Sequence, residues 1–276
     1  MRARITLLLF AILYSFTCLA QTNFEKHFTK KSLRIDFALS GNWDFQAAIQ
    51  QLREEPVWAG PVKNLIDPFG YGGYYINVYD KAGKELIYSR GFNTLFEEWR
   101  STEQAKTETQ SWTNSISIPY PKAPVIIEIT ARDKADMQFH PLLKQEIDPA
   151  SIFIDRGKLK ENRITKIQYN GDSSGKVDLV FLAEGYTADE QEKFVADAKR
   201  FTEALFKTPP YDTRREDFNV WAVDAVSEES GTDVSGKGIF KNTALNSGYY
   251  TFGVDRYLTT PDMKSIRDAV GNAPGD

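Results

Sequence analysis

Apolar and polar residues alternate in several short stretches of the first half of the chain, a pattern that predicts half-buried β-strands. In residues 32–39 the apolar positions are Leu33, Ile35, Phe37 and Leu39. Similar patterns predict further strands at 74–79, 85–90, 113–119, 124–132 and 151–155. Short strands separated by turn signals predict an antiparallel β-sandwich, which we place at residues 21–160.

Two details refine this β-rich region. The strands at 74–79 and 85–90 flank a turn in which Gly83 is available for a positive φ angle, so we expect a hairpin. Residues 94–105 have apolar positions at helical spacing and are expected to form a helical excursion.

The pattern changes near residue 162. Residues 177–183 form a nearly continuous apolar run, which is typical of a strand buried on both faces of a sheet. Thr187 and Glu190 then have the spacing of a helix capping box. The apolar face of the helix that follows consists of Phe194, Ala198, Phe201 and Leu205.

A second strand and a second helix come after this unit. The proline pair at 209–210 ends the first helix, and residues 218–226 are the next predicted strand. Strand, helix and strand at this spacing predict a βαβ unit. Thr260 is the expected N-cap of the second helix, with Pro261 at its first position and Gly271 as its stop.

Two strands and two helices would leave much of the apolar surface of such a sheet uncovered. We therefore expect residues 161–276 to be the first, incomplete part of an α/β domain. The predicted fold class is α+β overall, with an antiparallel β-sandwich followed by this incomplete α/β domain.

Composition and charge narrow the function classes. The chain of 276 residues is long enough for two ordinary domains, and its 41% of hydrophobic residues can build real cores. The formal net charge of −4 provides no basic surface for nucleic acid or for an anionic membrane. We expect neither as a partner.

Residues 1–20 have the three regions of a secretory signal peptide. Arg2 and Arg4 precede an apolar run at 5–14, and Ala20 is a small residue suited to cleavage. The apolar run is short for a membrane anchor. We expect a protein exported to the periplasm or the extracellular space, without a membrane span once the signal is removed.

Thiol and imidazole groups are scarce. Cys18 is the only cysteine and lies in the signal, so the mature chain has no disulfide and no cysteine zinc ligand. A lipid anchor on Cys18 is the alternative to cleavage, but residues 15–17 match such a signal poorly. His27 and His140 are the only histidines, whereas a zinc site usually needs three or four ligands. We expect no zinc site in these residues, and we expect His140 at the surface or in a cap.

Two glycine-rich segments match nucleotide-binding loops only in part. After residues 231–237, Gly238 stands where a Ser or Thr should meet the magnesium ion, and Asp233 would bring negative charge to the phosphates. Residues 171–176 are one residue short and precede their strand. We interpret both segments as flexible loops. No G-x-S-x-G elbow supports a serine hydrolase.

Acidic residues follow both strands of the βαβ unit. Glu184 follows the first strand, Asp224 lies in the second, and Glu228 and Glu229 come after it. A structural role is favoured, with Glu184 capping a turn and the other two glutamates facing water. The alternatives are a glycosidase acid pair or a calcium site.

The segment at 68–75, Pro-Phe-Gly-Tyr-Gly-Gly-Tyr-Tyr, mixes aromatic residues with glycines. We favour packing of these rings at the entrance of a strand. The alternative is an exposed platform that stacks on a sugar ring or on a peptide.

Three segments resemble the opening of the catalytic domain of the IgA-peptidase family of zinc metallopeptidases. They read KVDLVFLAEGYTADEQEKFVADAKRF, FNVWAVDAVSEESGTDVSGKGIFKNTALNSGYYTFGVDRYLTT and DMKSIRDAV, and the pieces at 242–246 and 255–258 are the most specific. Residues 21–160 resemble the β-rich domain that precedes the catalytic domain in this family. The resemblance therefore covers nearly all of the mature chain.

The resemblance implies a zincin-like α/β domain, zinc as cofactor and a protein or peptide as substrate. It also implies a helix with an H-E-x-x-H motif, whose histidines bind zinc while the glutamate activates a water molecule. The 276 residues contain no such motif, so no catalytic, cofactor-binding or metal-binding residue can be assigned. We expect a fragment that is inactive by itself.

Two other functions stay open. One is a non-catalytic exported module that binds a glycan or a protein. The other, ranked lowest, is a periplasmic glycosidase that uses acids such as Glu184. An in-frame H-E-x-x-H motif downstream of codon 276 would distinguish the peptidase from the binding module.

Overall fold

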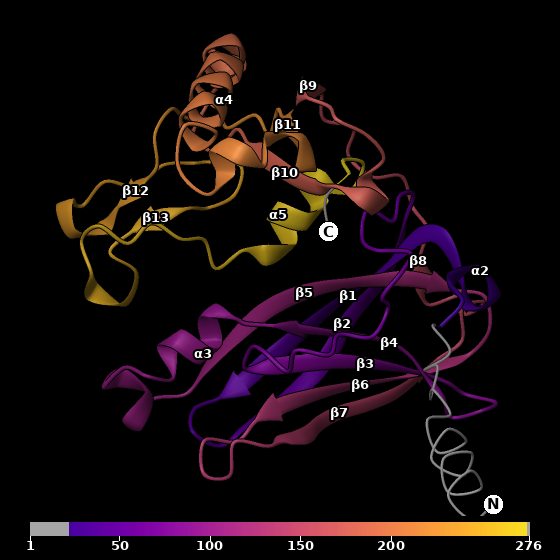
Figure 1. Ribbon diagram of the computed structural model, residues 1–276. Helices are drawn as coiled ribbons and strands as arrows, with labels where there is room; N and C mark the ends of the chain where they lie inside the picture. Colours follow the sequence, from indigo (N-terminus) through magenta and orange to yellow (C-terminus); the bar gives the residue numbers. More distant parts are fainter. Residues whose placement is uncertain (1–21, 275–276) are drawn as a thin grey trace, which may run out of the picture.

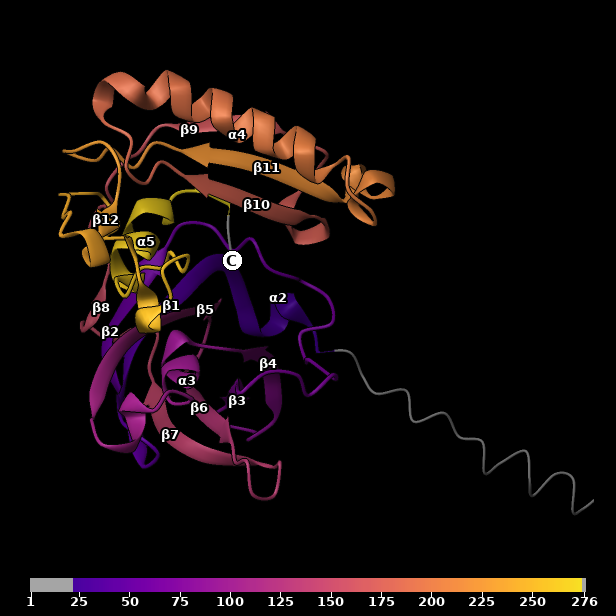
Figure 2. The same cartoon turned by 90° about the vertical axis from the view of Figure 1, so that its left-hand side faces the viewer.

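The computed structural model describes residues 22–274 and shows a mixed α+β fold with several small sheets and few helices (Figure 1). The expected signal peptide at 1–20 lies outside the described residues. Figures 1 and 2 show the β-rich first half and the second half as two bodies, with helix α5 (Met263–Val270) between them.

Two four-stranded sheets make up the first half. Their strand orders are β5-β1-β2-β8 and β4-β3-β6-β7. The strands are β1 (Phe28–Gly41), β2 (Phe45–Glu55), β3 (Tyr74–Asp80), β4 (Leu86–Phe92), β5 (Gln110–Pro121), β6 (Val125–Arg132), β7 (Phe139–Ile147) and β8 (Ile154–Asp155). The short helices are α2 (Phe24–His27) and α3 (Leu95–Trp99). Strands predicted around residues 32–39, 74–79, 85–90, 113–119 and 124–132 are confirmed, and so is the β3–β4 hairpin.

One hydrophobic cluster joins the two sheets. Apolar side chains of β1 and β5 belong to the same buried group as those of β3, β4 and β6. The ring of Phe37 on β1 lies edge-on to that of Phe92 on β4, with centroids 6.1 Å apart. The completely buried members of the cluster include Leu33, Ile35, Leu39, Ile76, Val78, Ile127 and Ile129. Burial of each such side chain contributes about 1.5–3 kcal/mol.

The polar face of β1 is buried too, which differs from the half-buried strand that alternation predicts. Ser32, Arg34 and Asp36 are 3%, 0% and 2% exposed. Helix α5 of the second half packs on this sheet and covers the face that the pattern assigned to water.

Several elements of the first half depart from the sequence-based expectations. β2 and β7 were not predicted, because polar residues dominate β2 and a proline interrupts β7. β8 is shorter than predicted, since Ile152 and Phe153 lie in a turn and are 86% and 84% exposed. In the β3–β4 turn the positive φ belongs to Lys84 (56°) and not to Gly83.

The second half contains a three-stranded sheet in the order β10-β11-β9. Its elements are β9 (Ile164–Gln168), β10 (Val177–Leu182), helix α4 (Gln191–Leu205) and β11 (Phe218–Val223). β10 and β11 are parallel, which confirms the βαβ unit, and β9 adds an antiparallel strand that was not predicted. A long segment between β11 and α5 contains the two-residue strands β12 (Asp233–Val234) and β13 (Gly248–Tyr249) and two short 3-10 turns.

Burial in this unit differs from the pattern in two places. β10 is not buried on both faces: its residues are half-buried or, at Val177, 54% exposed, because it is an edge strand. Phe201 of α4 is 51% exposed, and the buried positions are Gln191, Phe194, Ala198 and Thr202. The capping box at the start of this helical segment is confirmed.

Helix α5 begins two residues later than predicted. Its N-cap is Asp262 rather than Thr260, because the Asp262 carboxylate accepts the N–H of Ser265 at 2.9 Å. The helix ends at Val270 with Gly271 as C-cap, which confirms the predicted stop.

Ion pairs join α5 to the first half; the charged groups on β1 and β2 are buried, whereas the Asp268 side chain on α5 is 39% exposed. We call Arg34, Asp36, Glu55, Arg267 and Asp268 the Arg34 network. Arg34 donates to both carboxylate oxygens of Asp36 at 2.8 Å and to Asp268 at 2.7 Å. Glu55 lies 3.4 Å from Arg34 and accepts from Arg267 at 3.0 Å.

This network reaches three strands of one sheet. Arg267 also donates to the hydroxyl of Ser117 on β5 at 2.7 Å. Burial alone would raise the pKa of Asp268, but hydrogen bonds from Lys264 and Arg34 outweigh it and hold that pKa below its ordinary value. Helix α5 is thereby bonded to β1, β2 and β5.

Candidate functional site

Glu184 lies just after β10, at the carboxyl ends of the two parallel strands, where α/β sheets usually bind ligands. Its Oε1 accepts hydrogen bonds from the Thr243 hydroxyl at 2.6 Å and the Ser247 N–H at 2.9 Å. Its Oε2 accepts the Leu245 N–H at 2.8 Å. Both oxygens are therefore engaged by one loop of the same chain, in line with the structural role that the sequence favoured.

Ser227 makes a second set of hydrogen bonds next to those of Glu184. The hydroxyl oxygen of Ser227, a residue only 3% exposed, accepts the N–H groups of Gly185 and Ala244, each at 3.0 Å. Gly231 donates its N–H to the carbonyl of Gly185 at 3.0 Å. We call residues 184–185, 227–231 and 243–247 the strand-end loops. Ser227 was not predicted as a site residue from the sequence. A serine that follows a strand and precedes two glutamates matches no recognisable motif.

The other predicted acids surround these loops. Glu228 and Glu229 are exposed, as expected, but both contact Asn242: Glu228 accepts its side-chain amide at 2.6 Å and Glu229 its backbone N–H at 2.8 Å. The backbone N–H of Asn242 lowers the pKa of Glu229. Asp224 is 6% exposed and pairs with Arg163 at 2.6 Å. Glu184 thus holds residues 243–247, Glu228 and Glu229 hold the adjacent Asn242, and Asp224 pairs with Arg163 just before β9.

Replacing Glu184 with glutamine is expected to loosen residues 243–247. The new amide group would point donor hydrogens at N–H or O–H donors, and such a mismatch costs about 1–3 kcal/mol. Amide hydrogen exchange at Leu245 and Ser247 should accelerate about tenfold or more.

The matched control is Glu192→Gln, an exposed position in the first turn of α4. It should leave exchange at residues 243–247 unchanged. Equal protection in Glu184→Gln and in the unaltered chain would contradict the anchoring role.

Residues 22–274 do not fit a zinc ion. Among them, no group of three or more His, Cys, Asp or Glu side chains is placed to hold a metal. His27 lies on α2, where partial burial and then Lys26 lower its pKa. His140 is exposed on β7 and bonds to Asp136 at 2.8 Å, so its predicted surface position is confirmed. The described His, Asp and Glu side chains therefore do not form a zinc site, and we derive no zinc-dependent catalytic step from them.

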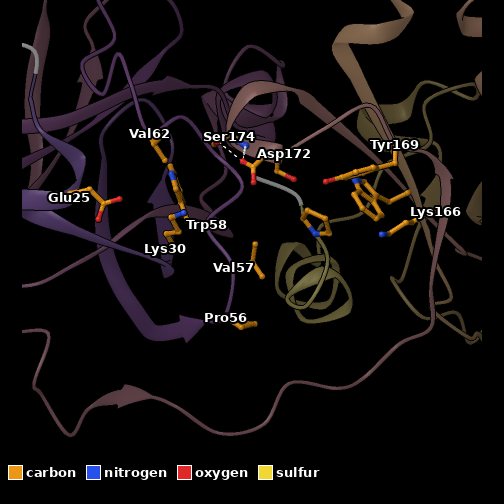
Figure 3. A pocket seen from close by; sticks show the side chains of 13 residues that line it. Glu25, Lys30, Pro56, Val57, Trp58, Val62, Lys166, Tyr169, Asp172 and Ser174 are labelled. Atoms are coloured by element: carbon orange, nitrogen blue, oxygen red, sulfur yellow. Dashed lines mark hydrogen bonds between the residues drawn. The ribbon is translucent and has the colours of Figure 1, made fainter.

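A cavity of about 440 Å³ opens between the two halves (Figure 3). Trp58 lies on one side of it, and Lys166 and Tyr169 lie on the other. The ammonium group of Lys166 is 4.9 Å from the Tyr169 ring and 5.6 Å from the Trp221 ring. Asp172 accepts the N–H of Ser174 at 3.0 Å, a local turn contact. The Ser174 hydroxyl also donates to the Asp172 carboxylate at 2.5 Å within the same turn. No histidine lies among the described residues that line the cavity, so we assign no catalytic pair to it and describe it as a gap between the two halves.

The aromatic segment at 68–75 divides into two parts. Tyr74 and Tyr75 are 0% and 7% exposed, as the favoured packing interpretation requires. Phe69 and Tyr71 are 70% and 75% exposed, so for these two rings that interpretation is wrong.

Fold and loops together define a class of protein: an α+β chain in which a βαβ unit, with loops fixed at its strand ends, is joined to two four-stranded sheets. These two sheets are mostly antiparallel, but β2 and β8 pair in parallel, which differs from the predicted antiparallel sandwich. Comparison with known families then gives the particular one. Residues 23–142 match the profile described as Peptidase M64 N-terminus, and residues 165–276 match the profile described as IgA Peptidase M64. The chain belongs to the M64 family of IgA peptidases, as the three quoted segments indicated.

No curated protein matches the chain. None of the helices within residues 22–274 has the length and apolar character needed to cross a membrane.

Proposed function

We propose that this chain belongs to an exported zinc metallopeptidase that hydrolyses peptide bonds of protein substrates. The match of residues 165–276 to the IgA Peptidase M64 profile carries the proposal. The sequence has only two histidines, His27 and His140, and neither lies in an H-E-x-x-H motif. These 276 residues therefore serve as scaffold, and a zinc-binding helix would have to come from sequence beyond them.

The proposal includes two domains. Residues 21–160 form an antiparallel β-sandwich, which is supported by the two sheets that share one core. Residues 161–276 form part of a zincin-like α/β domain, which is supported by the parallel β10–β11 pair and α4. Export rests on the signal-peptide pattern of residues 1–20.

Metal analysis tests the scaffold role. The purified chain 21–276, incubated with zinc and dialysed, is expected to retain less than one equivalent, because two separate histidines cannot build a site of three or four ligands. Tight one-to-one zinc would refute this assignment.

The reading frame beyond codon 276 tests the peptidase itself. An in-frame H-E-x-x-H motif supports the proposal, and adding that segment should confer zinc binding and proteolysis. A confirmed stop codon directly after residue 276 would instead favour the non-catalytic binding module.

A further inference from the structure

The rings of Phe69 and Tyr71 form an exposed pair on the loop before β3. Their centroids are 5.7 Å apart and their planes differ by 9°, so the rings are nearly parallel. Phe69 is 70% and Tyr71 75% exposed. Large aromatic side chains usually bury about 150–250 Å² each, so two neighbouring rings in water are an unusual feature that indicates a binding surface.

The backbone that carries these rings is firmly held. Arg132 of β6 donates through Nε to the carbonyl of Gly72 at 3.1 Å, through Nη2 to the carbonyl of Gly70, and through its backbone N–H to the carbonyl of Gly73 at 2.7 Å. Asn93 accepts the N–H of Gly73 at 2.8 Å. One guanidinium group and two strand ends therefore fix the loop.

The half-buried carboxylate of Asp67 holds the other end of the loop. Asp67 accepts the N–H of Phe69 at 2.9 Å and the N–H of Gly91 at 3.1 Å. Burial alone would raise the pKa of Asp67, but these hydrogen bonds outweigh it and lower that pKa. These hydrogen bonds hold the loop in one conformation in which both rings are exposed. The binding surface is therefore preorganised in the absence of ligand.

The surroundings of the pair favour a sugar over a protein. Gly70 and Gly72 flank Tyr71 and have φ angles of 66° and 93°, and a side chain at Gly70 would meet no atom within 4 Å. The two rings therefore project from a loop of glycines. Protein–protein hot spots usually lie within a broad apolar patch, and these rings do not. A pyranose ring has a flat C–H face that an aromatic ring can cover, while its hydroxyl groups stay in water.

We propose that Phe69 and Tyr71 form a binding site for a neutral oligosaccharide, with pyranose rings stacked on the two aromatic faces. The acidic net charge of the chain, −4, disfavours an anionic polymer as the ligand. This site is independent of the peptidase assignment, because it lies wholly on the β3, β4 and β6 side of the first half.

Calorimetric titration of the mature chain 21–276 with the hexasaccharides of β-1,4-glucose, β-1,4-N-acetylglucosamine, β-1,4-xylose and β-1,4-mannose tests the proposal. At least one is expected to bind in the micromolar to millimolar range, and Phe69→Ala/Tyr71→Ala should weaken it about tenfold or more. Phe69→Trp/Tyr71→Trp should retain or strengthen binding, because it keeps flat aromatic faces.

Phe153→Ala is the matched control, since Phe153 is an 84% exposed ring with no stacked neighbour among residues 22–274. It should leave the affinity unchanged, and unchanged thermal unfolding of all three variants shows that the fold persists. The proposal is overturned if none of the four sugars binds or if the double alanine variant binds as well as the unaltered chain. Ring-dependent binding of β-casein without any sugar binding would also overturn it, in favour of a protein ligand.

Discussion

Arg34→Ala is expected to lower the free energy of unfolding by about 3–5 kcal/mol, the cost of breaking a buried ion pair on one side. Arg34 has no exposed surface, and its removal leaves Asp36 and Glu55, which are 2% and 3% exposed, without their shared cation. Urea titration followed by tryptophan fluorescence measures the change. Amide exchange in α5 should also accelerate, because Asp268 loses its bond to the sheet.

Arg214→Ala is the control for this experiment. Arg214 also pairs with a carboxylate, Asp217, but their side chains are 67% and 45% exposed. An exposed pair contributes less than about 1 kcal/mol, so this variant should unfold nearly as the unaltered chain does. Similar losses in Arg34→Ala and Arg214→Ala would mean that the Arg34 network contributes little.

Gly185→Ala is expected to cost about 2–4 kcal/mol, because two penalties coincide at this position. Gly185 has a φ of 73°, and a Cβ there would lie 2.1 Å from the carbonyl oxygen of Gly231. Relief of that contact requires the strand-end loops to move apart, which would also disturb the hydrogen bonds to Ser227 and Glu184. Thermal unfolding and amide exchange at residues 243–247 measure the two effects.

Gly238→Ala separates backbone strain from steric contact. Gly238 has a similar φ of 66°, but a Cβ there would meet no atom within 4 Å. It should therefore cost only about 1–2 kcal/mol, the penalty of a left-handed conformation. If both alanine variants lose the same stability, the close approach of Gly185 to Gly231 is not what constrains these loops.

The sequence predicts those elements whose stability comes from their own apolar pattern. The strands around 32–39 and 124–132 and the capping box of Thr187 and Glu190 are local features, and the structure has them. β2 escapes prediction because a neighbouring strand and not its own side chains defines it: it is paired along nearly its whole length with β1.

Burial is the property that local patterns misjudge. The charged face of β1 looks solvated in the sequence, yet residues more than 200 positions away cover it. The opposite error occurs at β10, whose apolar run suggests a central strand, although among the described residues it pairs only with β11. Both errors arise because burial depends on elements that are distant in the chain.

In the candidate site, too, local features can be predicted from the sequence, whereas contacts with distant residues cannot. Acidic residues at the end of a strand are visible in the sequence, but the role of Glu184 depends on partners 59 to 63 residues downstream. The alternating glycines around Phe69 and Tyr71 were compatible with buried or exposed rings. Arg132, which fixes that loop, comes from a strand 60 residues away and gives no local signal.

The long sequence separation between α5 and β1 affects the order in which their contacts can form during synthesis. Asp268 is synthesised 234 residues after its partner Arg34. At typical translation rates of about 5–20 residues per second, Asp268 is synthesised roughly 12–47 s after Arg34. During that interval Arg34, Asp36 and Glu55 face water on an unfinished surface. Maturation of the amino-terminal sheets is therefore tied to synthesis of α5, and a ribosome that stalls before α5 would release a first half whose charged face is not covered.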